Sequence, residues 1–313
     1  MKIIITGALG HIGSKLIRDL TITNQNLELV LIDNLRTQRY CSLFNLLPER
    51  ASYKFYDLDI VSSNLDKIFN GAHCAIHLAA LTDAAGSFGN ADEVETVNLS
   101  ATESMVNACM KHNVKLIHIS STSVYGTQNN EVDENCSLEE LNPQSPYAKT
   151  KLLEENVVQS HAVKGNLDAV IFRFGTIFGV SPGIRFHTAV NKFCYQAALM
   201  KPITVWKTAY EQQRPYLDIN DAISAFTFAI ENNIFDGEIY NIVTLNSTVK
   251  EILDCIKKSV SDVSIEFVDN EIMNQLSYTV LSNKIRNLGF EFHGSIDEEI
   301  AKTISLFSGI RNE

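Results

Sequence analysis

Short apolar runs rich in Ile and Val alternate, through the first 174 residues, with segments whose apolar positions recur every three or four residues. The first pattern is typical of strands buried on both faces of a sheet, and the second of helices that cover such a sheet. The runs predict strands at residues 2–6, 27–32, 53–56, 74–78, 115–119 and 168–174. The intervening segments predict helices at residues 14–20, 65–69, 94–111 and 149–161. This alternation predicts an α/β fold with a parallel, doubly wound sheet.

Three glycines, Gly7, Gly10 and Gly13, separate the first predicted strand from the first predicted helix. The first glycine allows a tight turn, the second lets the backbone approach a pyrophosphate, and the third lets the helix pack closely on the strand. The N–H groups and the dipole of the helix N-terminus then favour an anion. Because the glycines follow a strand and open a helix, they predict a dinucleotide-binding (Rossmann) domain.

A carboxylate, Asp33, follows the second predicted strand, twenty residues after Gly13. At this distance from the glycines it can accept hydrogen bonds from the adenosine ribose and would repel a 2′-phosphate, which favours NAD over NADP. The alternative is an Asp that forms a turn after a strand. Arg36 lies nearby, and an Arg in this region can accommodate a 2′-phosphate.

Small and hydroxyl-bearing residues follow two further predicted strands. Ala79 and Ala80 come directly after the strand at 74–78, and the serine-rich residues 120–123 come after the strand at 115–119. Ligands of doubly wound sheets bind at the carboxyl ends of the strands, so both segments are candidates for the lining of a site. The alternatives are ordinary core alanines and a polar loop.

Tyr147 and Lys151 stand four residues apart at the predicted helix of residues 149–161. On a helix such residues share one face, with Cβ atoms about 6 Å apart. An ammonium beside a phenol lowers the pKa of the tyrosine, which can then take a proton from an alcohol near neutral pH. The alternative is a solvated Lys on a helix whose Tyr packs at its start.

Beyond residue 174 the pattern predicts a second, smaller set of elements. Helices are predicted at residues 188–200, 222–231, 248–260 and 296–306, strands at 203–206 and 238–243, and a turn at 286–290. The helix and strand between residues 222 and 243 would return to the nucleotide-binding domain. We therefore expect that domain to comprise residues 1–175 plus about 216–244, and a smaller α/β substrate domain to comprise about 176–215 plus 245–313.

Composition and charge restrict the partners and the location. A formal net charge of −11 without a basic run disfavours nucleic acid and anionic membranes, and no apolar run reaches the roughly 18 residues that span a bilayer. The first predicted strand begins at Lys2, so no signal peptide is expected, and the six cysteines show no paired spacing. We therefore expect free thiols in a reducing cytoplasm. No two cysteines and no Cys/His pair stand at zinc-ligand spacing, so no metal is expected.

Several of these motifs occur together, in a fixed order along the chain. They are Thr-Gly-x-x-Gly-x-x-Gly at residues 6–13, Asp33, Asp59-Ile60, His-Leu-Ala-Ala at residues 77–80, Asn98, Ser-Ser-x-x-Val-Tyr-Gly at residues 120–126, and Tyr147-x-x-x-Lys151. In this combination the chain resembles the extended short-chain dehydrogenases/reductases, within the NAD-dependent sugar-nucleotide epimerase/dehydratase group that includes the UDP-galactose and UDP-glucuronate 4-epimerases. The resemblance covers nearly the whole chain and is strongest through residue 155.

The resemblance implies NAD as the cofactor and a role for each matching position. Tyr147 would be the base, Ser121 would hydrogen-bond the same substrate oxygen, and Lys151 would bind the nicotinamide ribose and lower the pKa of Tyr147. The implied cofactor-binding residues are Gly7, Gly10, His11, Ile12, Gly13, Asp33, Asn34, Asp59, Ile60, Leu78, Ala79, Ala80, Asn98, Tyr147 and Lys151.

The resemblance also implies a nucleoside-diphosphate sugar as the substrate, bound by Thr122, Thr176, Arg185 and Arg214. Both arginines are candidates for the diphosphate, because a planar guanidinium makes bidentate, permanently charged contacts with phosphate. The alternative for Arg214 is a surface ion pair with Glu211 or an Asp. Many relatives have Asn where Thr176 stands, so the sugar is left open.

The activity implied is 4-epimerisation through a 4-keto intermediate. A net 4-oxidase or 4-ketoreductase shares the first half-reaction and stays open, as does a non-catalytic NAD-binding sensor or scaffold. A 4,6-dehydratase is disfavoured, because such relatives carry Asp and Glu where this chain has Thr122 and Ser123, and neither hydroxyl is an acid near pH 7.

The family commonly forms dimers through two paired helices. In this chain the corresponding helices are those predicted at residues 94–111 and 149–161, and Leu152, Val157 and Val158 stand where a seam would form. We therefore expect a homodimer. The alternative is that these apolar residues pack on their own sheet.

Overall fold

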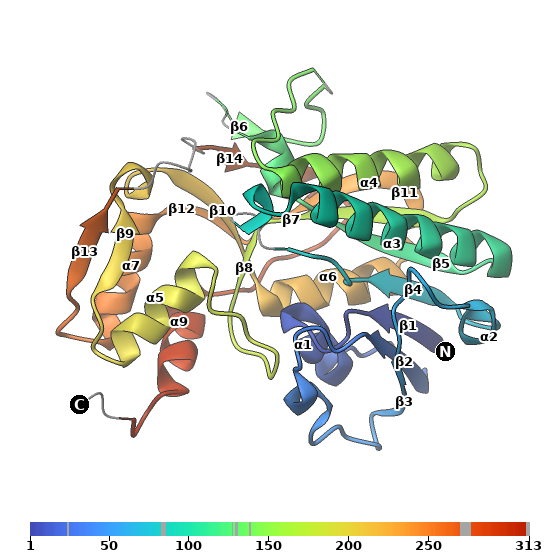
Figure 1. Ribbon diagram of the computed structural model, residues 1–313, viewed down its shortest axis with the longest axis horizontal. Coiled ribbons are helices and arrows are strands. Elements are labelled where there is room, and N and C mark those ends of the chain that lie inside the picture. The colour runs from blue at the N-terminus through green and yellow to red at the C-terminus, as the bar shows by residue number, and fades with distance from the viewer. Residues whose placement is uncertain are drawn as a thin grey trace.

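A sheet of seven parallel strands forms the centre of the protein, with helices on both of its faces (Figure 1). The computed structural model describes residues 1–23, 25–82, 86–126, 128, 131–137, 139–269 and 277–310. In sheet order the strands are β11 (Asp236–Ile242), β7 (Ala169–Phe174), β5 (Lys115–Ser121), β4 (Cys74–His77), β1 (Lys2–Thr6), β2 (Leu27–Asp33) and β3 (Ala51–Asp57). The predicted doubly wound Rossmann sheet is thereby confirmed.

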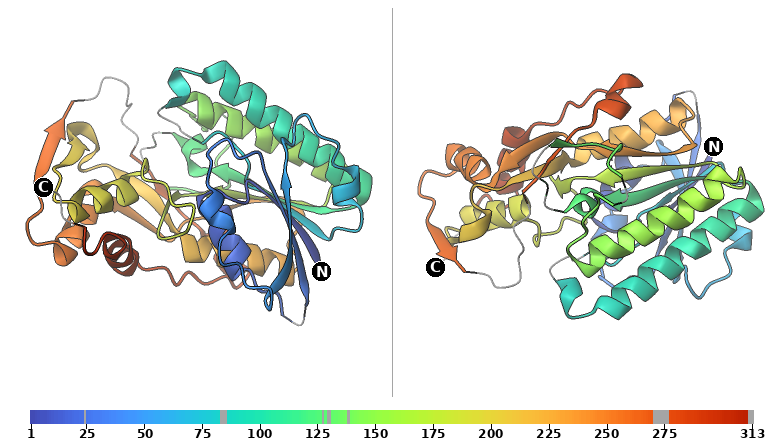
Figure 2. Two further views of the ribbon diagram at one scale, coloured as in Figure 1. Left: turned by 60° about the horizontal axis from the view of Figure 1, so that its bottom comes forward. Right: turned by 90° about the horizontal axis from the view of Figure 1, so that it is seen from above.

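Neighbouring residues of each strand belong to two separate hydrophobic cores. Ile3 and Ile5 of β1 pack with helices α1 (His11–Asp19) and α6 (Ile219–Glu231). Ile4 packs on the opposite face, in the core formed with α2 (Asp66–Phe69), α3 (Ala91–His112) and α4 (Pro146–Val163). Figure 2 shows α3 and α4 lying side by side over their face of the sheet.

A smaller unit with its own core lies beside the sheet, at the end where the parallel strands finish (Figure 1). Its helices are α5 (Ala189–Ala198), α7 (Val249–Ser259) and α9 (Ile296–Ser305), and a short helix α8 (Asn283–Asn287) contacts β11. Among the described residues, its strands form a three-stranded sheet of β12 (Leu245–Thr248), β10 (Gln213–Asp218) and β8 (Thr176–Phe178), and a two-stranded sheet of β13 (Ile265–Val268) and β9 (Ile203–Trp206). A further strand pair, β14 (Thr279–Val280) and β6 (Glu131–Val132), packs on a separate small core. The domain boundaries given above stay a prediction.

The structure corrects several predicted boundaries. Helix α4 begins at Pro146, three residues earlier than predicted, because the Ser145 hydroxyl caps it and Pro is favourable in the first turn. Helix α1 likewise begins at His11 rather than at residue 14. Strand β10 was not predicted, and the segment predicted as a turn at 286–290 overlaps helix α8.

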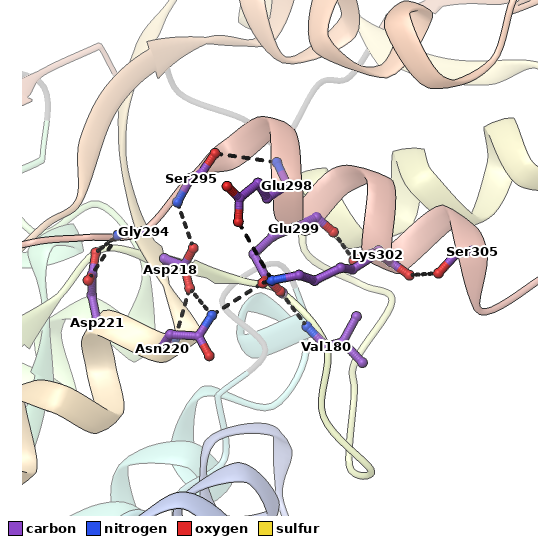
Figure 3. Close-up of polar contacts among 12 residues, drawn as sticks. Val180, Asp218, Asn220, Asp221, Gly294, Ser295, Glu298, Glu299, Lys302 and Ser305 are labelled. Atoms are coloured by element: carbon purple, nitrogen blue, oxygen red, sulfur yellow. Dashed lines mark hydrogen bonds and ion pairs between the residues drawn. The ribbon is translucent and has the colours of Figure 1, made fainter.

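Residues 293–295, which precede α9, tie the smaller unit to the start of α6 (Figure 3). Their backbone N–H groups donate to the carboxylates of Asp218 and Asp221 at 2.8–3.1 Å. Glu299 of α9 accepts a hydrogen bond from the backbone of Val180 at 3.2 Å. The C-terminal helix therefore holds a loop that belongs to a distant part of the sequence.

The residues expected in a dimer seam are mostly directed inward. Val158 is fully buried in the core under α4, so its assignment to a seam is wrong. Leu152 and Val157 are partly buried and pack on hydrophobic cores of the same chain. Among the apolar residues of α4, Leu153 and Val163 are 40% and 85% exposed.

No described helix is long and apolar enough to cross a bilayer.

Candidate active site

Two adjoining cavities of about 420 and 370 Å³ lie at the carboxyl edge of the central sheet. Residues shared by their walls, including His11, Leu78 and Arg185, make them parts of one cleft. The order of the strands reverses between β1 and β4, and ligands of doubly wound sheets bind at such a point. The cleft therefore lies where the topology favours a ligand.

The glycines of residues 7–13 form a cradle at the first cavity. Gly7 has a φ of +64°, and a Cβ atom there would lie 2.7 Å from the backbone nitrogen of Ala79. A Cβ atom on Gly13 would lie 2.4 Å from the carbonyl oxygen of Gly7. Helix α1 thus begins directly against this turn, and no side chain caps its N-terminus. Its first N–H groups face a cavity that suits an anion.

Tyr147 and Lys151 line the second cavity, and the other predicted cofactor residues, with one exception, line the first. Besides the glycines, those in the first cavity are His11, Ile12, Asp33, Asn34, Asp59, Ile60, Leu78, Ala79 and Ala80. Asp33 accepts hydrogen bonds from the backbone N–H groups of Leu9 and Leu35, both at 3.0 Å, which fixes its carboxylate beside the glycine turn. Asn34 donates to Asp59 at 3.0 Å and so joins the ends of β2 and β3.

Asn98 is the exception, since it does not line the described walls of either cavity. Its side chain is buried in α3, where it accepts from the backbone N–H of Leu81 at 2.7 Å and donates to the Leu81 carbonyl at 3.0 Å. Leu81 itself lines the first cavity. Asn98 therefore fixes the backbone of Leu81 in the cavity wall and does not line the cavity itself.

Ser121, Tyr147 and Lys151 meet in the second cavity. Because α4 begins at Pro146, Tyr147 and Lys151 lie on successive turns of one helix, and the Lys151 ammonium is 5.9 Å from the centre of the Tyr147 ring. Ser121, at the end of β5, interacts with the Tyr147 hydroxyl and lowers its pKa. Ser123 donates to the Ser121 hydroxyl at 2.9 Å. A phenol, a hydroxyl and an ammonium thus face one space.

The ionisation of Tyr147 differs from the prediction in sign. Burial raises the pKa of Tyr147 above its usual value, and Lys151 offsets only part of that rise. Burial also lowers the pKa of Lys151, but the adjacent Glu154 and Tyr147 more than compensate, so the pKa of Lys151 lies above its usual value. The low pKa expected for Tyr147 is therefore not found, and its pKa is raised instead.

All four predicted substrate residues line the second cavity: Thr122, Thr176, Arg185 and Arg214. The Arg185 guanidinium donates to the Thr82 hydroxyl, and Arg214 donates to Gln212 at 3.3 Å. Glu211 pairs with Lys250 rather than with Arg214. The surface ion pair with Glu211 considered for Arg214 is therefore absent, and both guanidiniums reach the cavity.

Sequence reasoning missed several lining residues of the second cavity. They are Phe88, Gln144, His187, Thr188, Trp206 and Tyr278. These residues come from separate loops and short strands that no motif marks, so only the fold brings them together. Within the described ranges no group of three or more His, Cys, Asp or Glu is placed to hold a metal ion.

A buried ion pair lies next to residues that line the second cavity. Arg173 of β7 makes two hydrogen bonds to Glu155 of α4, at 2.8 and 2.6 Å, and both side chains are almost fully buried. Ser120, the neighbour of Ser121, donates to the same carboxylate. The pair joins α4 to β7, and the Ser120 contact joins α4 to β5, which carries Ser121. Tyr147 is thereby fixed relative to Ser121.

Comparison with known proteins gives one family and several relatives. The model of the NAD dependent epimerase/dehydratase family matches residues 3–243. The chain is 30% identical over 251 residues to the uncharacterized UDP-glucose epimerase YtcB of Bacillus subtilis, covering 77% of this chain and 76% of that protein. It is 30% identical over 323 residues to a dTDP-D-glucose 4,6-dehydratase of Bos taurus, covering 98% and 88%.

Solved structures with the same fold include two 4-epimerases. A UDP-glucuronic acid 4-epimerase from Bacillus cereus, in complex with UDP-glucuronic acid and NAD, is 25% identical, with a TM-score of 0.85 over 98% of this chain and 99% of that one. The UDP-glucose 4-epimerase of Thermus thermophilus, in complex with NAD, is 22% identical, with a TM-score of 0.81 over 99% of both chains. The second likeness shows the fold alone.

Proposed function

Because this chain belongs to the NAD-dependent epimerase/dehydratase family, we propose that it is an enzyme that inverts carbon 4 of a nucleoside-diphosphate sugar. The observation that carries the proposal is the meeting of Ser121, Tyr147 and Lys151 in a cavity continuous with the glycine cradle. The similar proteins named above include a UDP-glucose epimerase and a UDP-glucuronic acid 4-epimerase, which supports this chemistry, and also a 4,6-dehydratase.

The first cavity fits NAD. Gly7 and Gly13 leave room for a pyrophosphate at the start of α1, where a Cβ atom on either residue would collide with backbone. Asp33 would hold the adenosine ribose, and Lys151 the ribose of the nicotinamide. When bound, NAD supplies reversible hydride acceptance, which leaves acid–base chemistry to the protein.

Tyr147 is the group placed to move the proton of the sugar 4-hydroxyl. As phenolate it would accept this proton, and it would return the proton to the inverted alcohol afterwards. Ser121 would donate a hydrogen bond to the same oxygen, and Lys151 would stabilise the phenolate. Arg185 and Arg214 would bind the diphosphate and so leave the sugar facing Tyr147.

The second cavity argues against a dehydratase. Loss of water from the sugar needs further acid and base groups, which carboxyl side chains supply in dehydratases of this family. None of the residues that the structure describes in the wall of the second cavity is Asp or Glu. The Thr122 hydroxyl donates to the Phe174 carbonyl, and the Ser123 hydroxyl donates to Ser121. Both hydroxyls are thus engaged in hydrogen bonds within the protein.

The experiment is an assay of UDP-glucuronic acid, UDP-glucose and UDP-N-acetylglucosamine with purified protein and NAD. We expect a product inverted at carbon 4 and no net NADH absorbance. NADH in proportion to product would identify an oxidase, and loss of water from the sugar a dehydratase. No turnover of any nucleotide sugar, together with NAD binding, would support the sensor or scaffold alternative.

We expect NAD to bind more tightly than NADP, by about tenfold or more, because the fixed Asp33 carboxylate repels a 2′-phosphate. Arg36 is engaged by Glu93 at 2.9 Å rather than by Asp33. Titration calorimetry with both cofactors measures the ratio, and Asp33→Asn should reduce it. Asp57→Asn, which makes the same charge change at the end of β3 outside the cavity, is the control. Equal affinities in the wild-type protein would contradict the assignment.

We also propose a homodimer formed through the outer faces of α3 and α4, with Leu153 and Val163 in the seam because both are exposed. Sedimentation at micromolar concentration should show a dimer, and Leu153→Glu should raise the fraction of monomer. Leu288→Glu, at an exposed residue that follows α8, should leave the dimer unchanged. A wild-type monomer under these conditions would refute the proposal.

A further inference from the structure

Glu154 is a carboxylate buried behind the second cavity, and the chemistry proposed above does not use it. Its side chain is 1% exposed, on the turn of α4 that follows Lys151. One carboxylate oxygen lies 2.8 Å from the Lys151 ammonium, 3.2 Å from the Thr102 hydroxyl of α3 and 3.3 Å from Nε2 of His118 on β5. A charge so removed from water requires a compensating partner.

Lys151 is that partner, because the other groups around Glu154 carry no balancing charge. Burial lowers the pKa of His118 and lowers that of His77 to about 3, so both imidazoles are neutral near pH 7. Glu155, the next residue, is already paired with Arg173. Arg185 lowers the pKa of Tyr147 but forms no ion pair with Glu154, and Thr102 has no charge. Glu154 and Lys151 therefore form a pair of opposite charges.

The pair limits how Lys151 acts on Tyr147. The ammonium is held between Glu154 and the Ile119 carbonyl, at 2.8 and 3.0 Å, so its position is set from behind the cavity. At Tyr147 the two charges oppose each other: Lys151 lowers the pKa of the phenol, and Glu154 raises it.

We propose that Glu154 is a positioning residue that fixes the Lys151 ammonium and moderates its charge at Tyr147. The inference rests on the proposed function, in which Tyr147 moves the proton. If Glu154 served packing alone, its replacement would lower activity equally at every pH.

The test is the pH profile of turnover of the Glu154→Gln variant, measured with the UDP-sugar that the wild-type protein inverts. A nearby anion raises the pKa of both Tyr147 and Lys151, so its removal lowers both values. Turnover rises as Tyr147 loses its proton and falls as Lys151 loses its proton. The whole profile should therefore move to lower pH, by about one unit. A profile that coincides with that of the wild type overturns the proposal.

Two variants serve as controls for charge. Glu154→Asp keeps the carboxylate and should restore a profile close to the wild type. Thr102→Val removes a hydroxyl contact without changing charge and should leave the profile in place. Should the Gln variant fail to fold, Glu154→Met makes the same charge change at similar volume without requiring hydrogen bonds, and the same shift is expected.

A second measurement does not depend on catalysis. Lys151→Met and Glu154→Met each leave one buried charge unpaired, whereas the double variant removes both. The melting temperature of the double variant should exceed that of either single variant. Losses that simply add would overturn the pairing of Glu154 with Lys151. Absence of turnover with every nucleoside-diphosphate sugar would instead refute the proposed function, and the melting temperatures would still decide the pairing.

Discussion

Replacing Tyr147 with Phe is expected to lower turnover by about 10²–10⁴-fold, the usual contribution of a general acid–base group. The substitution removes one hydroxyl and leaves the ring and the start of α4 in place. NAD affinity and the melting temperature should therefore stay near those of the wild type. Initial rates of sugar inversion, titration calorimetry with NAD and thermal unfolding measure the three quantities.

Two further variants test the roles of Lys151 and Ser121 beside Tyr147. Lys151→Ala should lose turnover and also weaken NAD binding, because Lys151 would contact the nicotinamide ribose. Ser121→Ala should lose less turnover, since it deletes one hydrogen bond and keeps the proton acceptor. A folded Tyr147→Phe protein that turns over its substrate at the wild-type rate would refute the mechanism and revive the sensor or scaffold alternative.

Replacing Arg173 with Met is expected to destabilise the protein by about 3–5 kcal/mol, because the Glu155 carboxylate is left buried without its partner. The two side chains are almost fully buried and share two hydrogen bonds, so water cannot replace the guanidinium. Urea unfolding followed by circular dichroism measures the loss.

A variant that lacks the charges of both Arg173 and Glu155 is the matched control for the stability of Arg173→Met. The double variant Arg173→Met, Glu155→Leu should recover much of the lost stability, since no charge remains unpaired. Lys54→Ala breaks an exposed ion pair with Glu28 and should cause no measurable change. An Arg173→Met protein as stable as the wild type would show that the buried pair does not hold α4 to the sheet.

The sequence predicted site residues correctly placed in the cleft where short motifs stand at the ends of regular strands. The glycine cradle and the end of β2 are set by neighbouring residues, and the regular alternation of strand and helix places both at one edge of the sheet. Asp33 could be predicted as a site residue on that basis, and Tyr147 from its four-residue spacing to Lys151. The structure brings both into one cleft, as predicted.

The missed features depend on contacts between distant segments. Glu154 looks like a surface residue in the sequence, and only the packing of α3 and β5 over α4 buries it beside Lys151. The sign of the pKa shift at Tyr147 was missed for the same reason, because burial and a second charge cannot be read from a four-residue spacing. Trp206 and Tyr278 reach the cavity from segments without any motif.

The tie between α9 and the glycine cradle has a consequence for folding during synthesis. His11 contacts the Gly179 carbonyl across 168 residues, and Val180 is held by Glu299 across a further 119. The last strand of the central sheet ends at Ile242, so a growing chain can complete its sheet before this support exists. Contacts across such distances form slowly. A nascent chain would thus complete its central sheet before α9 can hold the loop that carries Gly179 and Val180.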